Sequence, residues 1–362
     1  MKLVKLQKLR KEMEQQNIEA LLITSQYNLR YITEFTGSAG LALITQEKAF
    51  FVTDFRYTEQ ASAQVKEFEV VQAKTNLLEE VTEISKSLGL KSIAFEQDYV
   101  TFALYTQYAE KLEAELKPAS GLIEKIRMIK TPEEVEVLKA AAKIADDAFE
   151  HICTFIKPGM AEVEVSNELE FFMRKQGATS SSFDIIVASG SRSALPHGVA
   201  TDKKIEEGDM ITLDFGALYN GYISDITRTI AVGEPSDKMK EIYQVVLDSQ
   251  VLALQNIKPG MTGIEADAIA RDHIKSKGYG EAFGHSTGHG IGLEVHEAPG
   301  LSFKSQTVLE PGMAVTVEPG IYLPGIGGVR IEDDILITES GNERLTHSTK
   351  ELRILQVTEE IK

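Results

Sequence analysis

Two aspartates in one predicted β-hairpin are the first residues whose spacing suggests chemistry. They are Asp214 and Asp225 in DMITLDFGALYNGYISDITRTI, residues 209–230, where two strand-like runs flank a turn. A four-residue loop over 218–221 would place the carboxylates directly opposite each other, whereas a two-residue turn at 220–221 would shift the register by two and leave both on one face. Neighbouring carboxylates repel unless a cation neutralises them. The hairpin therefore indicates either a divalent metal site or two aspartates on a solvated face.

Three of the chain's seven histidines lie within twelve residues of one another. The segment GHSTGHGIGLEVHEAP, residues 284–299, contains His285, His289 and His296 among glycines. Imidazole is a frequent metal ligand and a proton carrier near neutral pH. A single histidine is more often a hydrogen-bonded core residue, but three together in a glycine-rich segment indicate a functional site.

Two glutamates extend the acidic set. Glu318 ends one apolar strand in the segment 312–338, and Glu332 lies inside the next strand, GVRIEDDILIT. An acidic side chain in an apolar strand is costly to bury unless a cation or a hydrogen-bond donor lies beside it. Arg330 precedes Glu332 by two residues and shares its face of the strand, so it could donate to a carboxylate that binds metal.

These segments together supply four carboxylates and one imidazole as candidate metal ligands: Asp214, Asp225, His289, Glu318 and Glu332. A ligand set rich in carboxylates suits Mn²⁺ first, with Zn²⁺ or Co²⁺ as further candidates. Four carboxylates carry too much negative charge for one divalent ion in a confined site. Two ions about 3.5–4 Å apart, with bridging carboxylates, balance that charge better.

With these motifs the second part of the chain, about residues 122–360, resembles the pita-bread metallopeptidases, the family of methionine aminopeptidases, aminopeptidase P and prolidase. The resemblance lies in LDFGALYNGYISDITRT, TGHGIG, VEPGIY and RIEDD, which contain the five candidate ligands. It implies an α+β fold, with a pita-bread catalytic domain that has internal pseudo-two-fold symmetry. It also implies active-site roles for four further residues, the first of them in the stretch LPHG: His197, His285, His296 and Arg330.

The first part of the chain narrows the choice within this family. NLRYITEFTGSAG and FFVTDFRYTEQA are similar to the smaller, creatinase-like α/β domain that precedes the catalytic domain in aminopeptidase P, prolidase and creatinase. The resemblance implies a homodimeric Xaa-Pro aminopeptidase, which acts on small peptides with proline at the second position. The alternatives are a prolidase restricted to Xaa-Pro dipeptides and, more distantly, a non-catalytic pita-bread module that binds a protein.

A mechanism can be expected from this resemblance and from general chemistry. Two metal ions would make a bridging water reactive near neutral pH. Glu318 is the expected general base, which takes the proton of the water and later delivers one to the departing proline nitrogen. His285 or His296 could donate to the developing oxyanion. His197 and His296 are the candidates for the proline pocket, and Asp214 for binding the amino group of the substrate.

The supporting elements are expected in two domains, 1–121 and 122–362. In the first, four strands alternate with helices, as in an α/β unit. The predicted strands lie at 19–24, 40–45, 49–55 and 92–98, and the predicted helices at 56–66, 76–88 and 100–115. In the second domain, Thr131, Pro132 and Glu134 form a capping signature for a helix that begins at 132. The string KPGM at 157–160 and again at 258–261 suggests an internal duplication.

Composition limits the remaining possibilities. The formal net charge of −17 repels phosphate backbones, so we expect no nucleic-acid partner. The sequence contains no apolar run of about 18 residues that could span a membrane, and its N-terminal segment lacks the apolar centre of a signal peptide. The single cysteine, Cys153, cannot form an internal disulfide, and we expect it in the core of a cytoplasmic protein.

Overall fold

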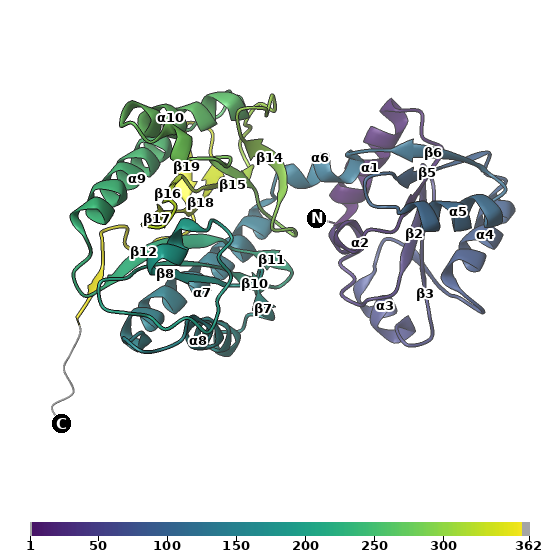
Figure 1. Cartoon of the computed structure of the whole chain (residues 1–362). Helices are drawn as coiled ribbons and strands as arrows, with labels where there is room; N and C mark the ends of the chain where they lie inside the picture. The colour runs from purple at the N-terminus through teal and green to yellow at the C-terminus, as the bar shows by residue number, and fades with distance from the viewer. Residues whose placement is uncertain (1, 357–362) are drawn as a thin grey trace. The chain divides into compact units, whose positions relative to one another are not determined.

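The computed structural model describes residues 2–356, with the side chains of residues 5–356, and it divides between residues 127 and 128 into two units (Figure 1). Each unit has its own strands and its own hydrophobic core. Within the described range, no helix is long and apolar enough to cross a membrane.

The sequence analysis places the domain boundary at 121, before helix α6 (Leu122–Met128). Contacts place nearly all of this helix in the first unit. The guanidinium of Arg127 donates from Nη1 to Asn28 Oδ1 at 2.9 Å, and both side chains are buried. The division therefore follows the hydrogen bonds of α6 and lies six residues beyond the position expected from sequence.

The first unit is one six-stranded sheet in the order β4-β3-β2-β1-β5-β6. Its strands are β1 (Ala20–Ile23), β2 (Leu41–Thr45), β3 (Ala49–Thr53), β4 (Glu69–Gln72), β5 (Ser92–Glu96) and β6 (Glu115–Ala119). Its helices besides α6 are α1 (Lys2–Gln15), α2 (Gln26–Thr33), α3 (Thr58–Gln64), α4 (Leu77–Leu88) and α5 (Phe102–Lys111). The four predicted strands are present, and the two that sequence reasoning missed, β4 and β6, are the edge strands. Their residues are mostly exposed or half-buried, so neither strand has the apolar run that identifies a buried strand.

The second unit has four long helices, α7 (Pro132–Phe155), α8 (Glu162–Lys175), α9 (Asp237–Asn256) and α10 (Gly263–Ser276). In Figure 1, α8, α9 and α10 lie at the margin of this unit. Helix α7 begins as predicted. The hydroxyl of Thr131 accepts from the Glu134 N–H at 3.3 Å, and the Glu134 carboxylate accepts from the Thr131 N–H at 2.8 Å. This reciprocal cap satisfies two of the backbone donors that every helix leaves open at its start.

The strands of the second unit form two principal sheets, β8-β9-β12-β20 and β14-β13-β15-β18-β19. The first contains β8 (Ile186–Ser189), β9 (Met210–Phe215), β12 (Ile226–Val232) and β20 (Ile354–Leu355). The second contains β13 (Gly288–Gly290), β14 (Glu297–Leu301), β15 (Ala314–Val317), β18 (Asp333–Ile337) and β19 (Asn342–Arg344). Shorter pairings involve β7 (Ser180–Ser181), β10 (Ala217–Tyr219), β11 (Tyr222–Ile223), β16 (Gly320–Leu323) and β17 (Gly327–Arg330).

The two KPGM strings mark equivalent positions in two halves of this unit. Each string is followed by a helix of 14 residues, α8 in the first half and α10 in the second. The same backbone pairing recurs: the Gly159 N–H donates to Ile205 O at 2.8 Å, and the Gly260 N–H donates to Leu309 O at 2.8 Å. The repeated hydrogen bonds support the internal duplication expected from the repeated string.

The predicted hairpin is present, and its register decides between the two turns considered above. Strand β9 pairs with β12 so that Asp214 lies opposite Thr227. The turn consists of Asn220 and Gly221, which both have positive φ, 47° and 85°, as a two-residue hairpin turn requires. Of the two turns that the sequence left open, the structure therefore has the two-residue one, and Asp214 is not directly opposite Asp225. The two-residue alternative leaves both aspartates on one face, because Asp225 and Thr227 are two apart along the strand.

Cys153 lies in the core of the second unit, as expected, among side chains from α7, α8 and the first sheet. Burial raises the pKa of its thiol to about 11. Because the thiolate is the reactive form of cysteine, this residue is chemically inert near neutral pH.

Candidate active site

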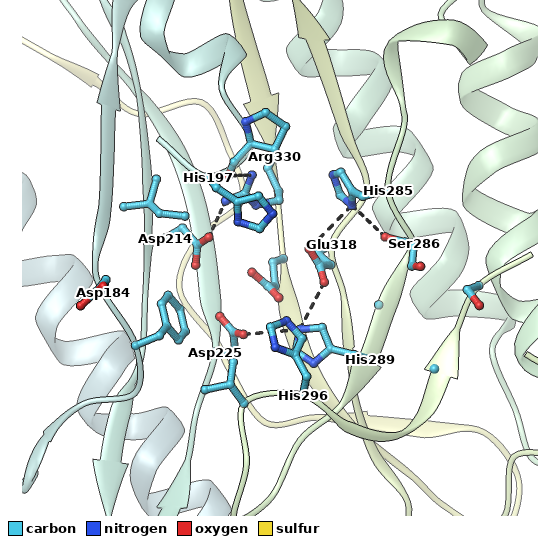
Figure 2. Close-up of a pocket in the computed structure, with 18 of the residues that line it drawn as sticks. Asp184, His197, Asp214, Asp225, His285, Ser286, His289, His296, Glu318 and Arg330 are labelled. Carbon is cyan, nitrogen blue, oxygen red and sulfur yellow. Dashed lines mark hydrogen bonds and ion pairs between the residues drawn. The ribbon is translucent and has the colours of Figure 1, made fainter. Parts of the chain in front are cut away.

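One cavity in the second unit, with a volume of about 560 Å³, brings the predicted site residues together (Figure 2). Apolar side chains, among them Phe183, Ile186 and Val295, form part of its wall. All nine residues named from the sequence line it: His197, Asp214, Asp225, His285, His289, His296, Glu318, Arg330 and Glu332. They come from both halves of the duplicated unit, so the fold assembles the site from segments far apart in the chain.

Asp225, His289 and Glu332 form the tightest group. Each offers a potential ligand atom, and these atoms all lie within 4.8 Å of one another. Nδ1 of His289 donates to the Gly290 carbonyl oxygen at 3.2 Å, which leaves Nε2 facing the carboxylates, 3.8 Å from Asp225 Oδ2. An imidazole oriented in this way presents its lone pair to the cavity, as a metal ligand must.

Glu318 lies between two histidines (Figure 2). Its Oε1 is 3.4 Å from Nε2 of His289, and its Oε2 is 3.9 Å from Nδ1 of His285. The hydroxyl of Thr316, two residues earlier, donates to Oε1 at 3.3 Å. The carboxylate lines the cavity, so it can exchange a proton with a molecule bound there.

A chain of polar contacts runs from Asp214 to His285. The guanidinium of Arg330 donates from Nη2 to Asp214 and from Nη1 to the hydroxyl of Tyr322, the latter at 2.8 Å. The Tyr322 hydroxyl in turn lies 2.8 Å from Nε2 of His285, whose Nδ1 donates to the Ser286 carbonyl oxygen at 2.8 Å. Both ring nitrogens of His285 therefore have protein partners.

Sequence reasoning missed three residues that hold this constellation in place, of which Tyr322 is one. The hydroxyl of Thr227 donates to Glu332 Oε2 at 2.6 Å, and the carboxylate of Asp334 accepts from the Asp225 N–H at 2.8 Å. Thr227 could have been found, because it is two residues after Asp225 on the same face of a strand. The roles of Tyr322 and Asp334 depend on contacts across the fold, for which their own segments give no sign.

Burial controls the charges in the cavity. Burial raises the pKa of Asp225 and of Glu332 well above the ordinary carboxyl value, and nearby carboxylates raise both further. Burial also raises the pKa of Glu318 to about 8. For His285 and His289, burial lowers the pKa to about 4. Near neutral pH the imidazoles are therefore neutral, and the carboxylates resist ionisation unless a cation is present.

The donor atoms fit divalent metal ions. Oδ1 of Asp214 and Oδ1 of Asp225 are buried, and neither accepts a hydrogen bond from any residue that the structure describes. Buried carboxylate oxygens of this kind need a donor or a cation. Several carboxylates with one imidazole nitrogen match the preferences of Mn²⁺ and similar ions.

The stability of the metal-free protein should fall as pH rises from about 6.5 to about 8. In this window folded Glu318, whose pKa is raised from 4.5 to about 8, still binds a proton that the unfolded chain has released. The folded state then binds more protons, so a rising pH favours unfolding. His285 and His289 have the opposite effect, but only between about 4 and 6.5. Melting temperatures measured with excess chelator test the sign. Glu318→Gln should make the slope shallower without abolishing it, because the raised pKa values of Asp225 and Glu332 act in the same direction. A melting temperature that rises across the window would contradict the assignment.

Two family patterns match the sequence. The pattern of metallopeptidase family M24 covers residues 136–339, and that of the creatinase/prolidase N-terminal domain covers residues 5–129. The chain belongs to metallopeptidase family M24. The predicted α+β fold, with a creatinase-like domain before a pita-bread catalytic domain, is confirmed, and so is the prediction of a metallopeptidase. Membership of family M24 also implies divalent metal ions, which the donor set of the cavity fits.

Similar proteins in this family carry more specific names. An Xaa-Pro dipeptidase from Bacillus anthracis is 62% identical, with a TM-score of 0.97 over 98% of this chain and 100% of its own. The Xaa-Pro dipeptidase of Pyrococcus furiosus is 43% identical over 351 residues, which are 96% of this chain and 99% of its own length. An X-Pro aminopeptidase from Thermotoga maritima MSB8 is 41% identical, with a TM-score of 0.89 over 95% of this chain and 99% of its own. These names support the dipeptidase alternative better than the aminopeptidase that the sequence analysis placed first.

Proposed function

We propose that this metallopeptidase hydrolyses Xaa-Pro dipeptides, the activity for which its dipeptidase relatives are named. The observation that carries the proposal is the convergence of four carboxylates and His289 on one cavity, with buried carboxylate oxygens that have no donor among the described residues. A non-catalytic module would have no need to maintain such a costly set of buried charges.

The residues proposed to hold two divalent ions are Asp214, Asp225, His289, Glu318 and Glu332. Bound there, the ions would neutralise the carboxylates, polarise the scissile carbonyl and acidify a water molecule. Arg330 and Thr227 keep two of these carboxylates in place, because Arg330 donates to Asp214 and Thr227 donates to Glu332. Mn²⁺ as the ion, the homodimer and the cytoplasmic location stay predictions.

Glu318 is the proposed general base. It takes a proton from the attacking water as the new C–O bond forms, and it returns a proton to the proline nitrogen as the C–N bond breaks. The proline ring nitrogen must gain this proton to leave as a secondary amine when the C–N bond breaks, as the leaving nitrogen of any amide must. The contacts of Glu318 with His289 and Thr316 keep its carboxylate directed into the cavity.

His296 is the better candidate for donation to the developing oxyanion. The two ring nitrogens of His285 lie against Tyr322 and Ser286, so His285 has no N–H left for the substrate. The ring centroid of His296 lies 4.2 Å from that of His289, beside the proposed ligands. We assign His285 to a positioning role through Tyr322 and Arg330.

The proline ring is proposed to lie between His197 and His296, with apolar wall residues such as Phe183 and Val295 around it. The amino group of the substrate would bind near Asp214. Such a site would select proline by the shape of the ring, because the tertiary amide of an Xaa-Pro bond has no N–H that could donate a hydrogen bond.

Release of the first residue from longer peptides with proline second is a second candidate, and the charges of the cavity favour it. Arg330 is the one lysine or arginine among the described residues that line the cavity, and it already donates to Asp214 and Tyr322. A dipeptide brings its terminal carboxylate close to the scissile bond, where it meets histidines that burial keeps neutral. A longer peptide has a neutral peptide group at that position.

The two candidates are separated by comparing Ala-Pro with Ala-Pro-Ala as substrates of the Mn²⁺-loaded protein. We expect Ala-Pro to be cut with the higher kcat/KM. Efficient release of alanine from the tripeptide with little cleavage of the dipeptide would establish the second candidate. Failure to cut either peptide, with metal bound, would overturn the proposed specificity.

A further inference from the structure

The segment between β8 and residue 201, which we call the 190–200 loop, forms one wall of the cavity. Pro196, His197 and Val199 of this loop line the cavity. The loop contains none of the five proposed metal ligands, so it contributes to the shape of the site and not to the metal centre.

One buried carboxylate, that of Glu162 at the start of α8, binds both ends of the loop. Glu162 is fully buried and is not among the residues that line the cavity. Its Oε1 accepts from the N–H and from the hydroxyl of Ser189, both at 2.8 Å. Its Oε2 accepts from the N–H and from the hydroxyl of Thr201, at 3.1 and 2.8 Å. The two ends of the loop are therefore joined through one side chain.

Arg192 connects the same carboxylate with the interior of the loop. Its Nη1 donates to Glu162, and its Nη2 donates to the Val199 carbonyl oxygen at 3.0 Å. Burial by itself would raise the pKa of Glu162, but the hydrogen bonds from Ser189, Arg192 and Thr201 bring it below the ordinary value. Glu162 is thus ionised near neutral pH, and charge-assisted hydrogen bonds of this kind are about twice as strong as neutral ones.

In the second half of the duplicated unit, the position equivalent to Glu162 has no side chain. Gly263 corresponds to Glu162, because the Gly263 N–H donates to Thr307 O at 3.0 Å as the Glu162 N–H donates to Lys203 O at 3.0 Å. A Cβ on Gly263 would lie 2.2 Å from the Gly300 carbonyl oxygen. In that half the wall of the cavity packs directly on the helix, whereas in the first half the Glu162 carboxylate fills the corresponding space.

We propose that Glu162 is a positioning residue of the active site, whose carboxylate fixes the 190–200 loop so that Pro196 and His197 present a preformed wall to the substrate. This inference rests on the proposed function, because it assigns the loop to the binding of an Xaa-Pro peptide. Preforming a wall lowers the cost of ordering it when substrate binds. Loosening the loop should therefore weaken substrate binding more than it slows the chemical step.

The test is Glu162→Gln in the Mn²⁺-loaded protein, with Ala-Pro as substrate. Glutamine keeps the size but loses the charge, and its NH₂ group faces N–H donors at one end of the loop. We expect KM to rise at least about tenfold while kcat changes by less than about threefold. Glu164→Gln is the matched control, because Glu164 is on the same helix, exposed, and outside the cavity. It should leave both constants unchanged.

Limited digestion with trypsin gives a readout that does not depend on activity. Cleavage after Arg192 should be at least about ten times faster in Glu162→Gln than in the wild type or in Glu164→Gln, because a released loop fits a protease and a fixed one does not. Arg192→Lys keeps the cleavage site but loses the bond to Val199. Arg192→Lys should also raise KM and speed cleavage after residue 192, each by a smaller factor. It provides the test if Glu162→Gln does not fold.

Equal KM values and equal cleavage after Arg192 in the variants and the wild type would overturn the proposal. So would a loss of kcat with KM unchanged, which would place Glu162 in the chemical step. A wild type that cuts no Xaa-Pro peptide would instead refute the proposed function, and the digestion would still show whether Glu162 fixes the loop.

Discussion

Glu318→Gln should lower kcat for Xaa-Pro hydrolysis by a factor of about 10³, within the range that a general acid–base residue contributes. Glutamine has the same shape and keeps one oxygen for a metal ion, but it cannot take the proton of the attacking water. The Thr316 hydroxyl can still donate to the remaining oxygen. We therefore expect the folded structure and bound metal to be retained, as judged by circular dichroism and by metal analysis of the purified protein.

Glu310→Gln is the control for that variant, since Glu310 is exposed and outside the cavity. It should keep the wild-type rate. A Glu318→Gln protein that holds two metal ions and still turns over at more than about a tenth of the wild-type rate would exclude Glu318 as the base.

Asp225→Asn should abolish activity by a different route, the loss of metal. Asp225, His289 and Glu332 are the three residues whose potential ligand atoms lie within 4.8 Å of one another. Of these three, Asp225 is the one on the β9–β12 hairpin. Even the loss of a residue that only orients a ligand weakens metal binding about 10–100-fold, so we expect at least a 100-fold loss here. Calorimetric titration of the chelated variant with Mn²⁺ measures this.

The same substitution should stabilise the metal-free protein. Burial and the charges of Glu332 and Asp214 raise the pKa of Asp225, which means that an ionised carboxylate is unfavourable at that position. Asparagine has nearly the same shape and does not have to take up a proton when the chain folds, so it avoids this cost. The melting temperature of Asp225→Asn in chelator should therefore be at or above that of the wild type. Asp272→Asn, in an exposed position on α10, should change neither metal affinity nor melting temperature. Unaltered Mn²⁺ affinity in Asp225→Asn would remove Asp225 from the proposed ligands.

The fold was predictable where local signals and apolar pattern agree. The cap at Thr131 and Glu134 gave the start of α7, and four buried strands of the first unit were found from their apolar runs. The edge strands β4 and β6 were missed because half-exposed residues leave no such run. The choice between a two-residue and a four-residue turn was open from sequence, since both keep Asp214 and Asp225 on one face.

The site was predictable in its membership and less so in its geometry. Nine of the residues that line the cavity were named from the sequence. The carboxylates stood out because acidic residues in apolar strands are costly without a cation, whereas His197 was named only through the family resemblance. That His285 is fully bonded, and so unsuited to bind an oxyanion, depends on Tyr322 and Ser286. The hydrogen bonds that the Glu162 carboxylate accepts likewise depend on Ser189 and Thr201, which come together only in the folded chain.

Substrate length could not be settled from sequence for a physical reason. A dipeptidase and an aminopeptidase of this family would share the chemistry at the scissile bond and differ in what surrounds the group after proline. The substrate group that follows proline is bound or blocked by charged side chains and steric barriers from several loops, which come together only in the folded cavity. The names of the similar proteins support a dipeptide as the substrate. The cavity lining supports a longer peptide, because Arg330 is its one lysine or arginine among the described residues and already has partners.

The most direct test of the central claim is titration of the chelated protein with Mn²⁺ while the hydrolysis of Ala-Pro and of Ala-Ala is followed. We predict no hydrolysis without metal, a rate that rises until two equivalents are bound, and a preference for Ala-Pro of at least about 100-fold. Full activity in excess chelator would contradict metal-dependent hydrolysis. Equal rates for the two dipeptides would contradict a site shaped for proline.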